Sequence, residues 1–402
     1  MTRRNRRGAR PGTRAALVCT SVLLAASCGR VTSGPAGRGG PVVALSAPYN
    51  TVLSTSVGTW AVVPMGILSQ PLNTFWELFY RPRGSAKWRL VTPPGVALNG
   101  GLVLSEVAPG PLTVGIEPTN LLKFSPLAQS QVHGGSWTPG LVPGALAATP
   151  GALASSAGPR MLAVLRSGAG EIVASSGSVL NWTDVVTEHG LASSAGKSCG
   201  LTSLGSVAFS RVGTAFAGGA CSEPGAVGVF ARTAASWALV APRLGGVLAS
   251  QPATVLRLWS AASGSAARVG GLVASGGATT SNLVAIWNGG VPTSWTVSPP
   301  LPVGAGSHLI STSMAPSGEI LALVALPHGG TRLETVQPGR SWRQLVDVPA
   351  GTAAVAIGTD GAIDALAVTG QSLFTDWRAD TATGSWDRLQ AVRVSVPIGS
   401  SS

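Results

Sequence analysis

The sequence is poor in charged residues, in tyrosine and in long apolar runs. Charged residues make up 10% of its 402 residues, whereas soluble proteins average about 25%. Because 45% of the residues are hydrophobic, the chain can bury a large core, which excludes a disordered protein. No segment after residue 27 contains 18 uninterrupted apolar residues, so we expect no transmembrane helix in the mature chain.

The formal charge of +12 comes largely from the N-terminus. Six arginines lie between Arg3 and Arg14, and an uncharged stretch from Ala15 to Ser27 follows them. This order is typical of a secretory signal peptide, which we place at residues 1–27. Its removal leaves a charge of +6, and the remaining arginines are scattered singly. The sequence therefore predicts no nucleic-acid binding.

The end of the apolar stretch resembles the lipobox of bacterial lipoproteins. In Ala25-Ala-Ser-Cys28-Gly, small residues precede a cysteine, although the usual leucine lies one residue early, at Leu24. The resemblance implies a lipid on Cys28, which would hold the protein on the outer face of the cytoplasmic membrane. Residues 28–44 would form a flexible tether. The alternative is an ordinary signal peptide with an incidental cysteine.

Two of the four cysteines are left for a disulfide. Cys19 leaves with the signal peptide and Cys28 is the expected lipid site, which leaves Cys199 and Cys221. The residues between them read as a strand, a glycine-bearing turn at 210–213 and a second strand. Such a hairpin brings the two cysteines together, so we expect a disulfide in an oxidising compartment. Two free buried thiols are the alternative.

Tryptophans recur through the chain at intervals of 44 to 58 residues, and serine precedes five of the seven that set this rhythm. Repetition at this period indicates a repeat architecture. The seven are Trp88, Trp137, Trp182, Trp237, Trp295, Trp342 and Trp386.

Each repeat reads as four short strands joined by turns, as in residues 308–346, and the 54 glycines supply many of these turns. Four antiparallel strands every 40–50 residues are typical of a β-propeller blade. We therefore expect an all-β propeller over residues 45–398, most simply with seven four-stranded blades, six or eight being the alternatives. A tryptophan at the start of each outer strand would fill the gap between blades, or in one or two cases hold a sugar.

Two segments resemble the Asp-box of the BNR, or sialidase-type, propellers. Asp380-Thr-Ala-Thr-Gly-Ser-Trp386 and Pro338-Gly-Arg-Ser-Trp342 approach the box, although neither meets its full pattern of Ser/Thr-x-Asp-x-Gly-x-x-Trp. The resemblance covers the rhythm of most of residues 45–398. It implies a propeller of this type in an extracellular protein, and it carries no activity with it.

The sequence offers no convincing catalytic or metal site. Gly196-Lys-Ser-Cys-Gly200 fits the G-x-S-x-G pattern but follows no apolar strand. The four histidines lack the spacing of zinc ligands, and we expect no metal and no cofactor. A sialidase-like site needs a tyrosine nucleophile and carboxylates near the axis. The charged or titratable residues of the expected innermost strands are Glu106, Arg160, Arg211, Arg257 and His308, with neither tyrosine nor aspartate.

These observations favour a monomeric, lipid-anchored propeller that binds a protein or a glycan without catalysis. The alternative is a glycan-active hydrolase or lyase built on the same fold. An enzyme should gather two carboxylates, or a carboxylate with tyrosine or histidine, around the central channel, whereas a binding module should show only neutral or isolated polar groups there.

Overall fold

The computed structural model describes most of the chain between Ala44 and Arg393. Residues 1–43, which include Cys28 and the expected signal peptide, lie outside the described residues. The described ranges are 44–45, 51–55, 57–66, 74–93, 102–106, 112–116, 123–130, 135–147, 149–156, 158–234, 236–260, 269–276, 280–289, 294–304, 306–345, 347–358, 360–370, 373–380 and 384–393.

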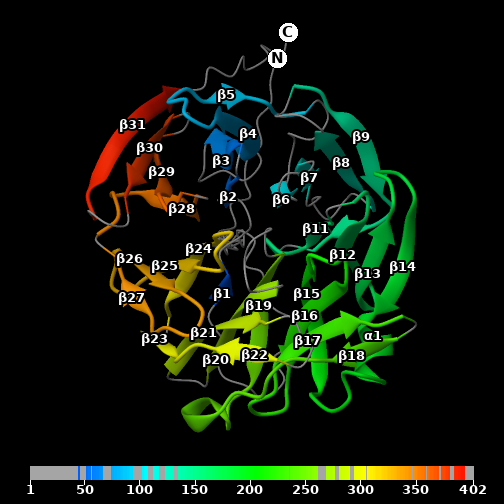
Figure 1. Ribbon diagram of the computed structural model, residues 1–402. Helices are drawn as coiled ribbons and strands as arrows, with labels where there is room; N and C mark the ends of the chain where they lie inside the picture. The colour runs from blue at the N-terminus through cyan, green and yellow to red at the C-terminus, as the bar shows by residue number, and fades with distance from the viewer. Residues whose placement is uncertain are drawn as a thin grey trace, which may run out of the picture.

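The described strands form largely antiparallel sheets arranged around a common centre, and the strands of each meander step from the axis to the rim (Figure 1). This arrangement is a β-propeller, as the repeats predict. Among the described residues the helical elements are short: the α-helix α1 (Glu188–Ala192) and the 3₁₀-helix η2 (Gly246–Leu248). No helix in this part of the chain is long and apolar enough to cross a membrane.

Three sheets are four-stranded meanders. The first contains β2 (Thr51–Ser54), β3 (Gly58–Gly66), β4 (Thr74–Pro82) and β5 (Arg89–Leu90). The second contains β6 (Leu102–Glu106), β7 (Leu112–Ile116), β8 (Ser125–Ser130) and β9 (Thr138–Val142). The last along the chain contains β28 (Thr352–Ile357), β29 (Ile363–Gly370), β30 (Leu373–Ala379) and β31 (Trp386–Arg393).

Two sheets have a fifth strand. In one, β10 (Ala145–Leu146) and β11 (Leu153–Ser155) both pair with β12 (Met161–Ser167), which is followed by β13 (Gly170–Ser176) and β14 (Trp182–Thr187). The other is a meander of β24 (His308–Met314), β25 (Ile320–Ala325), β26 (Thr331–Val336) and β27 (Arg343–Gln344). Its fifth strand, β1 (Ala44–Leu45), pairs in parallel with β24.

The remaining strands make one nine-stranded sheet. It joins the meander β15 (Leu201–Phe209), β16 (Ala215–Cys221), β17 (Gly228–Arg232) and β18 (Trp237–Leu239) to β19 (Ala253–Ser260), β20 (Val269–Gly276), β21 (Thr280–Asn288), β22 (Trp295–Val297) and β23 (Leu301–Gly304).

The expected count of seven separate four-stranded blades was therefore wrong. Five blades are separate sheets, and the rest of the ring is a single sheet in which β16 pairs with β19. The cause is local: pairing of β16 with β17 ends at Gly219 opposite Gly228. The next two residues of β16 therefore keep free backbone groups on that edge, and Ala253 and Thr254 pair with them.

The hydrophobic core is divided among the gaps between neighbouring sheets. One cluster joins the first sheet to the last through Phe79 and Phe374, and Trp287, the largest fully buried side chain, belongs to the cluster between β19–β23 and β24–β27. Burying each twisted sheet against the next keeps both of its faces out of water.

All seven spaced tryptophans lie at the first residue of an outermost strand or directly before it. Trp88 is buried and belongs to the core cluster between the first and last sheets, and the other six are half-buried and pack against neighbouring clusters. Their rings therefore add apolar contact at the wide outer part of the gaps.

A disulfide joins Cys199 to Cys221, with 5.3 Å between the Cα atoms. This confirms the expected bridge. Leu201 and Cys221 are paired across β15 and β16, so the hairpin brings the two cysteines together as the sequence indicates.

The innermost strands run in the same direction along the axis. The amide of Val355 in β28 donates to the hydroxyl of Ser311 in β24 at 3.1 Å, and the amide of Ile357 donates to Ser313 at 3.3 Å. We call the side where these strands begin the entry face and the side where they end the exit face. The end of β2, at Ser54, lies on the exit face, since its hydroxyl contacts Asp364, which is paired with Ala356 at the end of β28.

Candidate functional site

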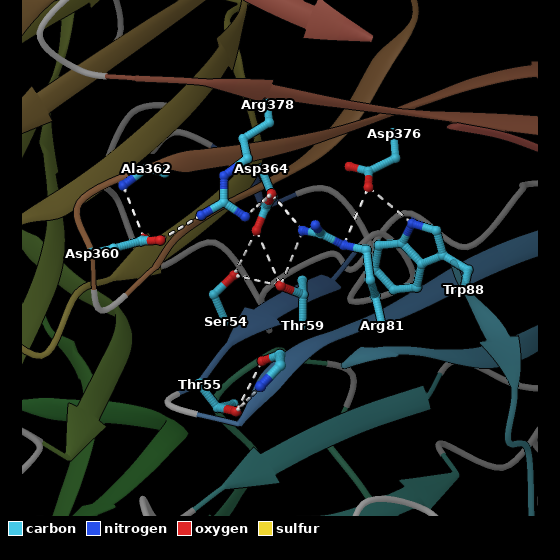
Figure 2. Close-up of polar contacts among 11 residues, drawn as sticks. Ser54, Thr55, Thr59, Arg81, Trp88, Asp360, Ala362, Asp364, Asp376 and Arg378 are labelled. Atoms are coloured by element: carbon cyan, nitrogen blue, oxygen red, sulfur yellow. Dashed lines mark hydrogen bonds and ion pairs between the residues drawn. The ribbon is translucent and has the colours of Figure 1, made fainter. Parts of the chain in front are cut away.

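A polar pocket lies between the first and last sheets, at the exit face. Its volume is about 280 Å³. The side chains come from the ends of β2 and β4, the start of β3, the turn after β28, the start of β29 and the end of β30 (Figure 2). Those that carry its chemistry are Ser54, Thr59, Arg81, Asp360, Asp364 and Arg378.

The floor of the pocket is a buried ion pair between Arg81 and Asp364. Their closest nitrogen and oxygen atoms are 2.6 Å apart, and the side chains are only 5% and 2% exposed. The hydroxyls of Thr59 and Ser54 donate to the same carboxylate at 3.0 and 3.2 Å. Since a carboxylate can accept about four hydrogen bonds, these partners hold Asp364 in one position.

The rim of the pocket is a second, more exposed ion pair. Arg378 contacts Asp360 at 2.5 Å and lies 3.7 Å from Asp364. Asp360 also accepts a hydrogen bond from the amide of Ala362 at 3.2 Å, which orients the turn between β28 and β29. Carboxylate acceptors and guanidinium donors thus stand side by side at the mouth of the pocket (Figure 2).

Behind the pocket lies a third carboxylate, Asp376, which is fully buried. It accepts a hydrogen bond from the indole nitrogen of Trp88 at 2.9 Å and is 3.3 Å from the Arg81 guanidinium. Burial raises the pKa of Asp376 to about 7, although the positive charge of Arg81 opposes this shift. Arg81 also lies over the Trp88 ring, 5.3 Å from its centre.

The raised pKa of Asp376 predicts that the protein loses stability as the pH rises from about 4 to about 7. The carboxyl group holds its proton more tightly in the folded protein than in the unfolded chain, so its contribution is greatest below its ordinary pKa and is lost through the folded value. We expect the free energy of unfolding, measured in urea across this range, to fall with pH, and the slope to be shallower in Asp376→Asn.

Burial also raises the pKa of Glu77, Glu334 and Glu171, and Glu171, whose shift is large, must be controlled. Burial and the neighbouring Glu188 raise the pKa of Glu171 to about 7. The free energy of unfolding of the double variant Asp376→Asn/Glu171→Gln should therefore depend even less on pH than that of Asp376→Asn. A slope that Asp376→Asn leaves unchanged would show that Asp376 titrates normally in the folded protein.

The structure does not bring the residues expected on the innermost strands into one site. Arg160 is exposed and donates to the carbonyl of Gly213 at 2.8 Å, and Arg211 and His308 are also exposed. Arg257 is buried and donates to the carbonyl of Thr312 at 2.9 Å. The side chain of Glu106 lies outside the described residues. Among the described residues, no three histidine, cysteine, aspartate or glutamate side chains could hold a metal ion.

Sequence reasoning missed the pocket residues, although one signal was present. Six of the seven aspartates fall within residues 347–387, which is unusual in a chain so poor in charge. Three of them, Asp360, Asp364 and Asp376, belong to the cluster at the boundary between the first and last sheets. The partner Arg81 is 283 residues from Asp364 in sequence, so no local motif links them.

No family model and no curated protein matches this chain. Solved structures do match. A lectin, BP39L from Burkholderia pseudomallei, is similar over 86% of this chain and 99% of its own, with a TM-score of 0.51 and 16% identity. A candidate 6-phosphogluconolactonase from Bacteroides uniformis is similar over 84% of this chain and 97% of its own, with a TM-score of 0.52 and 12% identity. At these identities the similarity shows the fold alone: the chain is a β-propeller.

Proposed function

We propose that the protein is an exported, lipid-anchored β-propeller that binds a glycan, without catalysis, in the exit-face pocket. The signal-like N-terminus and the lipobox-like residues around Cys28 support the location at the cell envelope. The likeness of residues 338–342 and 380–386 to the Asp-box supports an extracellular propeller of the sialidase type. The observation that carries the binding role is the preorganised polar pocket.

The chemistry of the pocket suits a sugar. Neighbouring hydroxyls of a sugar each donate and accept, and the rim offers an acceptor in Asp360 beside a donor in Arg378. Both are already held by other contacts, so binding costs little ordering of side chains. Pockets for drug-sized ligands measure about 300–1,000 Å³, so about 280 Å³ suits a single sugar unit at the end of a longer glycan.

The similar structures agree with this role at the level of the fold. One is named as a lectin and the other as a candidate lactonase. Because one fold hosts many functions, the support for glycan binding comes from the residues of the pocket and not from the shared fold.

A glycan hydrolase is the second candidate, and the raised pKa of Asp376 is the observation that favours it. A general acid must reach the bond that it protonates, but Asp376 is fully buried and does not line the pocket. The carboxylates that do line it, Asp360 and Asp364, are paired with arginines. Release of new reducing ends from a bound oligosaccharide would support the hydrolase.

Replacing Asp360 by asparagine is expected to weaken glycan binding about tenfold, because it removes the charge that orients Arg378 and the strongest acceptor at the rim. An array of oligosaccharides with different terminal sugars would identify the ligand, and calorimetry would compare affinities. Asp360 is 44% exposed, so we expect little change in the unfolding midpoint.

Asp184→Asn is the matched control, because Asp184 is an exposed aspartate of β14, in another sheet, and does not line the pocket. It should bind like the unaltered protein. Equal affinities for all three proteins, or an array with no glycan bound, would refute binding in this pocket.

A further inference from the structure

The exit face carries the pocket because of the direction of the strands around it. β2 and β4 both end there, at Ser54 and Pro82, and β29 begins there at Ile363, opposite the last residue of β28. Arg81 is the penultimate residue of β4 and Asp364 the second of β29. The cluster of charges therefore cannot be reached from the entry face without crossing the length of the sheets.

Both ends of the described chain lie on the opposite side. Thr51 begins β2, an innermost strand, and so lies at the entry face. Ala44 is paired with His308, the first residue of β24, in a parallel register, so β1 also starts there. The last described residue, Arg393, is paired with Leu373, the first residue of β30, which begins at the entry face.

From this arrangement we propose that the entry face is turned toward the membrane and that the pocket is presented away from it. The inference rests on the proposed lipid anchor at Cys28, and it deepens the proposed function. It means that the ligand is a glycan of the cell wall or the medium, reached from outside, and not the headgroup of a lipid in the same membrane.

The length of the expected tether agrees with an entry face that is turned toward the membrane. The sequence of residues 28–43 contains glycine, serine and proline, and a flexible linker of this length has a root-mean-square span of roughly 20 Å. The two faces are separated by the length of a strand, which is also roughly 20 Å. An anchor joined at the entry face therefore keeps that face closer to the bilayer on average.

The test places one fluorophore on each face of the lipidated protein. Ala86 lies in the exposed turn after β4, on the exit face, and His328 lies in the exposed turn between β25 and β26, on the entry face. Ala86→Cys and His328→Cys each supply a single reactive thiol, since Cys28 is acylated in this proposal and Cys199 and Cys221 are bridged. The labelled proteins are bound to phosphatidylcholine vesicles that contain a lipid with a nitroxide headgroup.

We expect quenching to be at least about twofold stronger at position 328 than at position 86, given the separation of the faces. Cys28→Ala should leave both labels in solution and unquenched. Equal quenching, stronger quenching at position 86, or vesicle binding that survives Cys28→Ala would each overturn the orientation.

The glycan assay separates this inference from the proposed function. An oligosaccharide that binds equally to the vesicle-bound protein and to Cys28→Ala supports an accessible, outward pocket, and weaker binding on vesicles contradicts it. If neither the vesicle-bound protein nor Cys28→Ala binds the oligosaccharide while the difference in quenching remains, the proposed glycan binding is refuted and the orientation is still supported.

Discussion

Replacing Arg81 by methionine should lower the free energy of unfolding by about 3–5 kcal/mol at pH 8, the range found when one partner of a buried ion pair is removed. The reason is that Asp364 and Asp376, which are 2% and 0% exposed, lose their shared counter-charge. Denaturant unfolding followed by tryptophan fluorescence would measure the change. The loss should shrink at pH 5, because Asp376 can then take a proton.

Two further variants test the cause of this loss. Arg388→Met removes an exposed arginine of β31 and should be close to neutral. Adding Asp364→Asn to Arg81→Met should recover part of the stability, because it removes one of the stranded charges. A loss that is independent of pH and unaffected by the second substitution would show that Arg81 acts through packing.

The double variant Cys199→Ala/Cys221→Ala should lose about 3 kcal/mol of stability. The bridge closes a loop of 22 residues, and the chain-entropy model gives about this value for a loop of that length. Both cysteines are buried, so the small apolar replacement adds no polar group to the core. Chemical denaturation of the oxidised protein and the double variant would measure the difference.

Reduction of the unaltered protein with dithiothreitol supplies the control. It should bring the free energy of unfolding close to that of the double variant, while dithiothreitol should leave the double variant unchanged. If the double variant were as stable as the oxidised protein, the bridge would not be a source of stability in this fold.

The contrast between these two sites shows which features the sequence can predict. The bridge between Cys199 and Cys221 lies within one hairpin, so alternation and turn residues are enough to bring its ends together. The ion pair of Arg81 with Asp364 spans 283 residues. It forms only because the ring closes and puts the first sheet beside the last, and no local pattern encodes that closure.

The sheet pairing shows the same limit on a smaller scale. Four-stranded units are visible as strands and turns in the sequence, but the union of β16 with β19 depends on Ala220 and Cys221, which lie beyond the first residue of β17 and have no partner in that strand. The free N–H and C=O groups of an edge strand can pair with any strand that comes close to them. The alternation of side chains in the sequence does not predict which strand that will be.

By itself, the sequence determined the all-β repeats, the places of the seven tryptophans in them and the partner of each bridged cysteine, because these depend on contacts within one sheet and its turns. Only the tertiary structure decided how the sheets join and where the charged pocket lies, because both depend on surfaces that meet after the ring has formed.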